Sequence, residues 1–321
     1  MLSSTNPWSG IEAVAKVGEL RARRADATHP YDFFWALDAN GRKLFLYRGA
    51  ELDADCPTPN LKGVAVEQTS DRLILRLIDG STEDIFAAFC HSLLERTRRV
   101  PSATLVPDAV LSHVEKWQRF FGRSNAGLLS DQELRGLFGE LSFLQSELIA
   151  RFGHSAVLFW NGPSGAPQDF TVGTAAFEVK TRLVGGPAAV TVSSAPQLWP
   201  LGGALHLVCY GIGDAAAQGD AARSPAALVD DIRACLTNAE ARDAFEDRLL
   251  QAGYVDRPEY ANRFFAISPA RFFEVREGFP RIVAEQVPVG VRSVQYVLEL
   301  QACLPFESEP DWMTMGASSG S

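Results

Sequence analysis

Two carboxylates and one ammonium stand close together in residues 167–180. Asp169 and Glu178 flank Gly173-Thr174, a two-residue connection typical of a tight β-hairpin. Pairing outward from that turn sets Asp169 opposite Glu178, where Cβ atoms are about 4.5–5.5 Å apart and like charges are destabilising. Lys180 emerges on the same strand face as Glu178. This set is suited to a hard, oxygen-liganded divalent cation with a lysine beside it.

Each of these residues also has an ordinary structural explanation. By composition alone, roughly one Glu-x-Lys tripeptide is expected in a chain of this length. Asp169 equally fits a turn or the start of a strand, and Glu178 and Lys180 equally fit a solvated strand face. The chemical interpretation gains support because Phe177 and Val179 are apolar, which puts Glu178 and Lys180 on a face different from the one that packs on the core.

A helix is predicted upstream of this hairpin. Ser130 followed by Glu133 is a capping-box pattern that marks its start. Glu140 lies about 100° from the centre of the apolar stripe that follows, so its side chain can reach past the core towards a neighbouring sheet. Gly136 and Gly139 each cost the helix roughly 1 kcal/mol relative to Ala, which indicates that something packs closely against it near Glu140. The stripe consists of Leu134, Leu137, Phe138, Leu141, Leu144 and Leu148.

These segments resemble the active-site motifs of the PD-(D/E)XK nuclease superfamily, in the same order along the chain. The matching stretches are Gly139-Glu140-Leu-Ser-Phe-Leu144, Pro167-Gln-Asp169-Phe, Phe177-Glu178-Val-Lys180-Thr and Ser193-Ser-Ala-Pro-Gln197-Leu. Further stretches are similar to a largely uncharacterised bacterial family of that superfamily, linked with restriction and phage-defence gene clusters: Leu137-Phe-Gly-Glu-Leu, Trp160-Asn-Gly-Pro, Gly253-Tyr254 and Phe279-Pro-Arg281. Gln168 departs from the pattern, since it stands where the superfamily name has Pro, but that position is not a ligand.

The resemblance implies Mg²⁺-dependent hydrolysis of phosphodiester bonds, with Mn²⁺ able to substitute. Asp169 and Glu178 would hold the metal, with the main-chain carbonyl of Val179 as an extra ligand. Glu140 would contribute directly or through water. Because Mg²⁺ keeps several waters, so sparse a set of protein ligands is chemically sufficient.

The resemblance also assigns roles to two residues that do not bind the metal. Lys180 would position the attacking water or stabilise the charge that develops on the phosphorane. Gln197 would support the site. The implied catalytic residues are therefore Glu140, Asp169, Glu178, Lys180 and Gln197.

The fold expected from these motifs is α/β, with a restriction-endonuclease-like core in which helices flank a mixed central sheet. We assign residues 128–305 to this nuclease-like domain and residues 306–321 to a frayed tail. Residues 1–127 form a β-rich N-terminal domain, mostly antiparallel, with flanking helices. Within it the patterns predict a helix around Ile11–Ala25 and a hairpin at Asn40-Gly41. In the second domain, Ala156–Trp160 is predicted to be a short strand.

Composition limits the partners. The 321 residues are 46% apolar and 21% charged, with no run of about 18 apolar residues and no secretory signal pattern. Five widely spaced cysteines favour a reducing cytoplasm, and no membrane partner is expected. The net charge of −9 argues against strong non-specific DNA binding, so affinity is weak or a partner delivers the DNA. The basic run at residues 96–99 is a solvated helix end or a contact to the DNA backbone.

The sequence therefore predicts a metal-dependent DNA endonuclease, a component of a bacterial restriction or phage-defence system that acts with DNA and with other proteins of that system. One alternative is a non-catalytic DNA-binding or assembly module that retains the nuclease fold. Another is a hydrolase of RNA or of a different phosphodiester.

Overall fold

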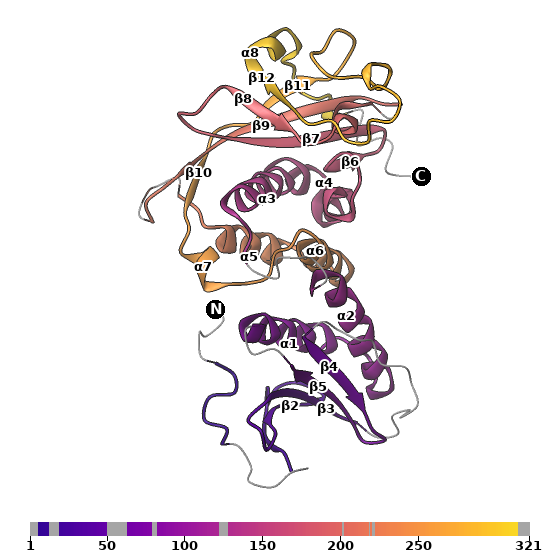
Figure 1. Ribbon diagram of the computed structural model, residues 1–321, viewed down its shortest axis with the longest axis vertical. Coiled ribbons are helices and arrows are strands. Elements are labelled where there is room, and N and C mark those ends of the chain that lie inside the picture. The colour runs from indigo at the N-terminus through magenta and orange to yellow at the C-terminus, as the bar shows by residue number, and fades with distance from the viewer. Residues whose placement is uncertain are drawn as a thin grey trace. The chain divides into compact units, whose positions relative to one another are not determined.

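The computed structural model describes residues 6–12, 19–49, 63–78, 82–121, 128–200, 202–217, 219 and 222–313. The chain divides into two compact units, Met1–Leu128 and Leu129–Ser321, and each is described by itself (Figure 1). Within the described residues, no helix is long and apolar enough to cross a membrane.

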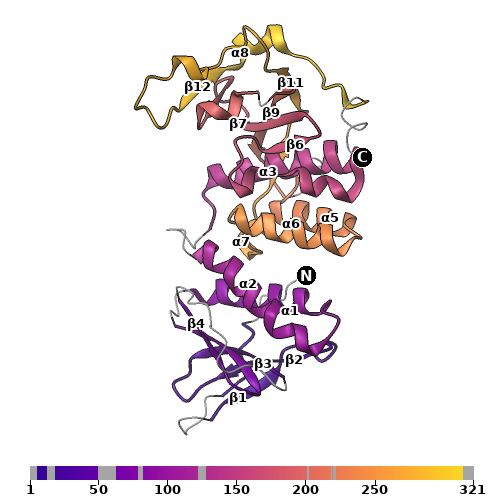
Figure 2. The same ribbon diagram turned by 90° about the vertical axis from the view of Figure 1, so that its right-hand side faces the viewer.

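The first unit contains a five-stranded antiparallel sheet in the order β1-β2-β3-β5-β4, with helices on one face (Figures 1 and 2). The predicted hairpin at Asn40-Gly41 is confirmed: Gly41 has φ 71°, and Asp38 Oδ1 accepts hydrogen bonds from the main-chain nitrogens of Asn40 and Arg42. The strands are β1 Arg21–Arg24, β2 Asp32–Leu37, β3 Lys43–Arg48, β4 Val64–Gln68 and β5 Arg72–Leu77. They are followed by α1 Glu83–Thr97, η2 Ala103–Leu105 and α2 Val106–Phe121.

The helix predicted around Ile11–Ala25 is wrong over the part that the structure describes. Arg21–Arg24 is strand β1, which pairs antiparallel with β2 in the register Arg24↔Phe34. Pairing with the edge of β2 satisfies the main-chain groups of this segment, and tertiary contacts of this kind override a weak helical preference. Residues 13–18 of the predicted helix lie outside the described residues.

The arginines of the basic run at the end of α1 all have interaction partners. Arg98 forms an ion pair with Asp26 of the β1–β2 connection. Arg96 and Arg99 also have partners. Such contacts are usual for charged side chains at the end of a helix. The alternative, a contact of this run with the DNA backbone, stays a prediction.

The second unit is built on a mixed sheet in the order β10-β9-β7-β6, with β11 also paired to β9. β7 and β9 run parallel, with Glu178 beside Leu207, and the other pairs are antiparallel. The α/β class and the mixed central sheet are therefore as expected. The strands are β6 Phe170–Val172, β7 Ala175–Leu183, β9 Leu205–Asp214, β10 Phe265–Ile267 and β11 Arg271–Glu274.

One face of this sheet is covered by a long helical segment that begins where the sequence predicts. The capping box is formed: Ser130 Oγ accepts from Glu133 N at 3.3 Å, and Glu133 Oε2 accepts from Ser130 N at 2.8 Å. The segment comprises α3 Asp131–Phe143, a π-helix η3 Leu144–Ile149 and α4 Ala150–Phe152. All six residues of the predicted apolar stripe are buried.

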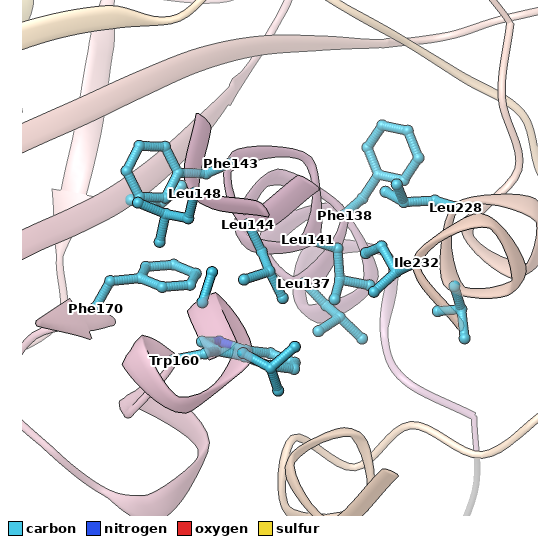
Figure 3. Close-up of a cluster of buried hydrophobic side chains, with 14 of the residues drawn as sticks. Leu137, Phe138, Leu141, Phe143, Leu144, Leu148, Trp160, Phe170, Leu228 and Ile232 are labelled. Atoms are coloured by element: carbon cyan, nitrogen blue, oxygen red, sulfur yellow. The ribbon is translucent and has the colours of Figure 1, made fainter. Parts of the chain in front are cut away.

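Further helices pack on the outer side of α3. Figure 3 shows Phe138 and Leu141 of α3 beside Leu228 and Ile232 of α5, with Trp160 and Phe170 in the same cluster. These helices are α5 Pro225–Cys235, α6 Ala239–Gln251 and α7 Pro258–Ala261. The strand predicted at Ala156–Trp160 is wrong, since Gly153–Phe159 is a 3₁₀ helix (η4) and Trp160 makes only an isolated bridge to Phe170. A short apolar run does not by itself distinguish a strand from a buried helical turn.

The opposite face of the sheet is also covered (Figure 2). A second apolar cluster joins Leu205 and Leu207 of β9 to Val190, Val192 and Leu198. The covering elements are β8 Ala189–Val192 and β12 Tyr296–Glu299, which form a two-stranded antiparallel sheet, with η6 Ala195–Leu198, α8 Leu300–Cys303 and η8 Leu304–Phe306. Short 3₁₀ turns η5 Gly162–Ser164 and η7 Ala284–Gln286 lie in the connections.

Part of the segment expected to be a frayed tail is docked on the second unit. Ser308 N donates to the carbonyl of Phe272, and Arg271 forms an ion pair with Glu307. The Trp312 ring stacks on Phe177 with centroids 5.3 Å apart. Residues 314–321 lie outside the described residues.

Candidate active site

The hairpin that carries the candidate site has the predicted register. Phe170 pairs with Phe177 and Val172 with Ala175, and Gly173 in the turn has φ 58°. Asp169 directly precedes β6, and its Oδ2 accepts a 2.8 Å hydrogen bond from the main-chain nitrogen of Val179 on β7. The hairpin therefore fixes the Asp169 carboxylate against the strand that carries Glu178.

The loop before β6 holds the main chain of Asp169 in place. Its carbonyl oxygen accepts from the main-chain nitrogens of Asn161 at 2.7 Å and Gly162 at 3.0 Å. A Cβ at Gly162 would lie 2.7 Å from Asp169 Oδ1, so a side chain there would displace the carboxylate. The close approach of this loop thus depends on glycine.

Glu178 and Lys180 lie together on one face of β7. The Lys180 Nζ atom is 2.7 Å from Glu178 Oε1, and the side chains are 14% and 0% exposed, respectively. Beyond this ion pair, neither carboxylate oxygen of Glu178 accepts a hydrogen bond from the described residues. As predicted, Glu178 and Lys180 lie on the face of β7 opposite to Phe177 and Val179, which pack towards α3. The second apolar cluster covers the Glu178 face as well. The explanation of Glu178 as part of a solvated strand face is therefore wrong.

Glu140 reaches the same region from α3. Its Oε2 accepts a 2.8 Å hydrogen bond from the indole Nε1 of Trp160, a residue that is fully buried. At Gly139 the helix backbone meets β7, where an added Cβ would lie only 2.3 Å from Thr181 Cγ2. The close packing predicted near Glu140 therefore occurs at Gly139. The prediction of close packing is wrong at Gly136, where an added Cβ would meet nothing within 4 Å.

Gln197 contacts the site through Lys180. Its Oε1 accepts from Lys180 Nζ at 3.2 Å and from the main-chain nitrogens of Ser193 at 2.9 Å and Ser194 at 3.3 Å. One amide oxygen thus orders the turn after β8 and also holds the ammonium group.

Burial raises the pKa of all three acidic groups, and repulsion by neighbouring carboxylates adds to the shifts of Glu140 and Glu178. Burial and the Asp169 charge raise the pKa of Glu140 to about 8, against the opposing effects of Trp160 and Lys180. Burial and the same charge raise the pKa of Glu178 well above its usual range. Burial also raises the pKa of Asp169, although Lys180 and the Val179 N–H oppose this shift. For Lys180, burial lowers the pKa, but the neighbouring carboxylates outweigh it and the net shift is upward.

A comparison with known families places the chain in one of them. A family model described as "Putative PD-(D/E)XK family member, (DUF4420)" matches residues 4–301. The chain belongs to the DUF4420 family. This membership confirms the superfamily that the motif order resembles. Neither the curated proteins nor the solved structures contain a match to the chain.

The DUF4420 site has the donor chemistry that a divalent cation requires. Asp169 and Glu178 supply hard oxygen ligands, and apart from the Lys180 ammonium the buried Glu178 oxygens have no hydrogen-bond donor among the described residues. The charges of Glu140, Asp169 and Glu178 all act on the single ammonium of Lys180, so a cation would relieve the excess negative charge. The described residues contain no group of three His, Cys, Asp or Glu side chains arranged around one metal position. Asp169 and Glu178 carry the oxygen ligands that Mg²⁺ and Mn²⁺ take, and Mg²⁺ usually keeps several waters beside such a pair.

Two residues of the DUF4420 site were missed by sequence reasoning. Trp160 appeared only as part of a family motif, and nothing in its local pattern indicates a contact with Glu140 twenty positions earlier. Gln168 was dismissed as a departure from the superfamily pattern. Gln168 is only 3% exposed, directly beside the candidate ligand Asp169. This burial indicates a role for Gln168, and it can be recognised only in the folded structure.

Proposed function

We propose that the protein is a Mg²⁺-dependent endodeoxyribonuclease that hydrolyses DNA phosphodiester bonds in the bacterial cytoplasm as a component of a restriction or phage-defence system. The observation that carries the proposal is the contact between the Lys180 ammonium and the buried Glu178 carboxylate, with the carboxylate of Asp169, just before β6, bonded to the Val179 N–H. Membership of a family described as a putative PD-(D/E)XK member supports a nuclease in general terms.

The acidic residues provide the metal site in this proposal. Asp169 and Glu178 would hold Mg²⁺ together with the carbonyl of Val179, and Glu140 would contribute directly or through a water. When bound, the cation supplies a Lewis acid for the phosphate and lowers the pKa of a bound water. The Val179 N–H holds the carboxylate of Asp169, and the Lys180 ammonium holds that of Glu178, so both would be in place before a cation binds.

Lys180 has a different task. Gln197 and Glu178 hold its ammonium, and the carboxylates keep its pKa high, so the group remains a cation. A fixed cation beside the scissile phosphate orients the attacking water and stabilises the negative charge that develops on the phosphorane. Gln197 supports catalysis by holding Lys180 in place.

The charge distribution favours delivery of DNA by a partner. Residues 129–321 contain 14 Lys and Arg against 23 Asp and Glu, so this unit accounts for the whole net charge of −9. An acidic surface repels the DNA backbone beyond the immediate neighbourhood of the metal. Other proteins of a defence system would then supply most of the DNA affinity.

Cleavage of supercoiled plasmid in Mg²⁺ tests the proposal. We expect nicking or cleavage by the wild type, and a loss of roughly 100-fold or more in Lys180→Ala and Asp169→Asn. Glu240→Gln, which changes an exposed carboxylate at the start of α6, serves as the control and should retain full activity. Equal rates for wild type and both site variants would exclude the assignment.

A non-catalytic DNA-binding or assembly module is the second candidate. It is favoured by one observation: Glu178 already forms an ion pair with Lys180, an arrangement that can persist without metal. Titration calorimetry with Mn²⁺ separates the two, because a module that has lost chemistry shows no binding heat that depends on Asp169 and Glu178. Parallel assays with single-stranded DNA and RNA identify the nucleic-acid class.

A further inference from the structure

Gln168 connects two parts of the candidate site that are far apart in the sequence. Its Nε2 donates to the main-chain carbonyls of Pro196 at 2.9 Å and Trp199 at 3.2 Å, and lies 3.4 Å from that of Gln197. The side chain is almost completely buried. One amide nitrogen therefore gathers the carbonyl groups of η6 and its C-terminal cap.

An amide suits this position for a chemical reason. The NH₂ group of Gln offers two donors without a charge, which matches a cluster of carbonyl acceptors in a buried place. A carboxylate would set acceptor against acceptor, and an apolar side chain would leave buried carbonyls unpaired. Gln168 therefore has a role of its own at the position where the superfamily name has Pro.

The turn that Gln168 holds also carries the residue that holds Lys180. Gln197 lies within η6, and its Oε1 accepts from Lys180 Nζ. Gln168 itself directly precedes Asp169 in the chain. The contacts thus run from the Asp169 segment through the η6 carbonyls to Gln197 and the ammonium.

A second anchor keeps η6 attached to the unit. Arg281 Nη1 donates to the carbonyl of Leu198 at 2.8 Å, and the Trp199 indole donates to that of Ile282 at 2.7 Å. Because these two hydrogen bonds remain, we expect that loss of the Gln168 amide increases the mobility of η6 but does not unfold it.

We propose that Gln168 is a positioning residue that sets the place of the Lys180 ammonium relative to the metal-binding carboxylates through η6 and Gln197. The catalytic consequence rests on the proposed function, whereas the link between Gln168 and η6 is independent of it. A group displaced by about 1 Å from its productive position can lose roughly 100-fold in rate, so this link is large enough to matter.

Hydrogen–deuterium exchange tests the link without any assay of activity. In Gln168→Ala, peptides covering residues 193–199 should exchange faster, since the Ser193 and Ser194 amides depend on Gln197 Oε1. Peptides covering residues 175–183 should be unchanged. Asn238→Ala, which removes the side-chain cap of α6, serves as a control that perturbs the unit elsewhere and should leave 193–199 unaltered. Unchanged exchange at 193–199 in Gln168→Ala overturns the inference.

Kinetics then test the consequence for catalysis. Gln168→Ala should lower kcat roughly 10- to 100-fold while the affinity for Mn²⁺, measured by calorimetry, stays within about twofold. In a Gln197→Ala background the same change should cost nothing further, because both act through one contact. If the double variant loses kcat by the product of the two single-variant factors, the positioning role of Gln168 is overturned. Gln168→Met, which keeps the length of the side chain and removes the donors, replaces the Ala variant if the latter fails to fold. An inactive wild type, with exchange altered as expected, refutes the proposed function and leaves the structural link standing.

Discussion

The indole nitrogen of Trp160 donates a 2.8 Å hydrogen bond to the carboxylate of Glu140, and so fixes the one acidic group of the site that comes from a helix. The Trp160 carbonyl is in turn held by Arg248 Nε of α6 at 2.6 Å. The ring lies in the apolar cluster of α3 and stacks on Phe170, the first residue of β6 (Figure 3). Trp160 therefore contacts both Glu140 and the first residue of the hairpin strand β6, and links their positions.

Trp160→Phe tests this support, since it keeps an aromatic ring and removes the donor. Glu140 then loses a hydrogen bond that opposes the rise of its pKa, so more of it is protonated at neutral pH. We expect a fall in cleavage rate of roughly 10-fold and a loss of about 1–3 kcal/mol in the free energy of unfolding. Trp8→Phe removes an indole donor to Leu44 in the first unit and should cost stability alone. Full activity of Trp160→Phe would show that Glu140 needs no such support.

Asp169→Asn should stabilise the metal-free protein while abolishing function. The folded-state pKa of Asp169 is raised, so the folded protein binds the proton more tightly than the unfolded chain does. This contribution to stability is present below the unfolded pKa and is lost as the pH rises through the folded one. At pH 7.5 without metal we expect the melting temperature of the variant to rise by about 2–4 °C.

The same variant should lose the response to metal. Mg²⁺ at millimolar concentration should raise the melting temperature of the wild type and of Glu240→Gln, but leave that of Asp169→Asn unchanged. Differential scanning fluorimetry provides both measurements. A variant that melts below the wild type without metal and still responds to Mg²⁺ contradicts the metal site.

His113 makes the first unit sensitive to acid. Burial lowers its pKa to about 3, with further contributions from Arg96 and Lys116. Because the unfolded chain binds this proton at about pH 6.5 and the folded unit does not, stability is lost as the pH falls below 6.5. Between pH 7 and pH 5 the loss is about 2 kcal/mol.

His113→Phe should remove most of this pH dependence. The imidazole stacks on Phe89 with centroids 5.5 Å apart, so a phenyl ring suits the space, and Ser92 Oγ keeps its bond to the Phe89 carbonyl. Urea unfolding at pH 7 and pH 5 measures the difference. The exposed His154, changed to Gln, should behave as the wild type. An unaltered pH dependence in His113→Phe would locate the acid sensitivity elsewhere.

Two glycines of α3 offer a matched pair of variants. Gly139→Ala would bring a Cβ to 2.3 Å from Thr181 Cγ2 and push α3 off β7, which moves Glu140. We expect a loss of about 1–3 kcal/mol in stability and reduced cleavage. Gly136→Ala meets open space and should stabilise the helix by about 1 kcal/mol with no effect on cleavage. Thr181→Ala, which removes the obstructing methyl group, should rescue Gly139→Ala, and its failure to do so would rule out the clash.

Local signals explain which parts of the fold were predicted correctly. The hairpin around Gly173 and the start of α3 at Ser130 depend on residues within a few positions of one another, so turn chemistry and capping identify them. The same turn sets the register that ends at Phe170 and Phe177, and Asp169 follows directly outside it, with its carboxylate bonded to the Val179 N–H. Glu140 was placed by the helical period, and its neighbour Gly139 marked the close contact with β7.

Long-range contacts explain the failures. β1 was mistaken for a helix because only its pairing with β2 makes it a strand. The burial of Glu178 could not be foreseen, since the elements that cover it arrive from β8, η6 and the chain beyond residue 295. The roles of Trp160 and Gln168 depend on partners 20 and 28 positions away.

A crystal structure of the protein soaked in Mn²⁺ tests the metal site most directly. We expect one anomalous difference peak between the carboxylates of Asp169 and Glu178, beside the carbonyl of Val179, and none in crystals of Asp169→Asn. Crystals in which this position stays empty at millimolar Mn²⁺, or in which the ion binds elsewhere in both proteins, would contradict the assignment of a metal-dependent nuclease.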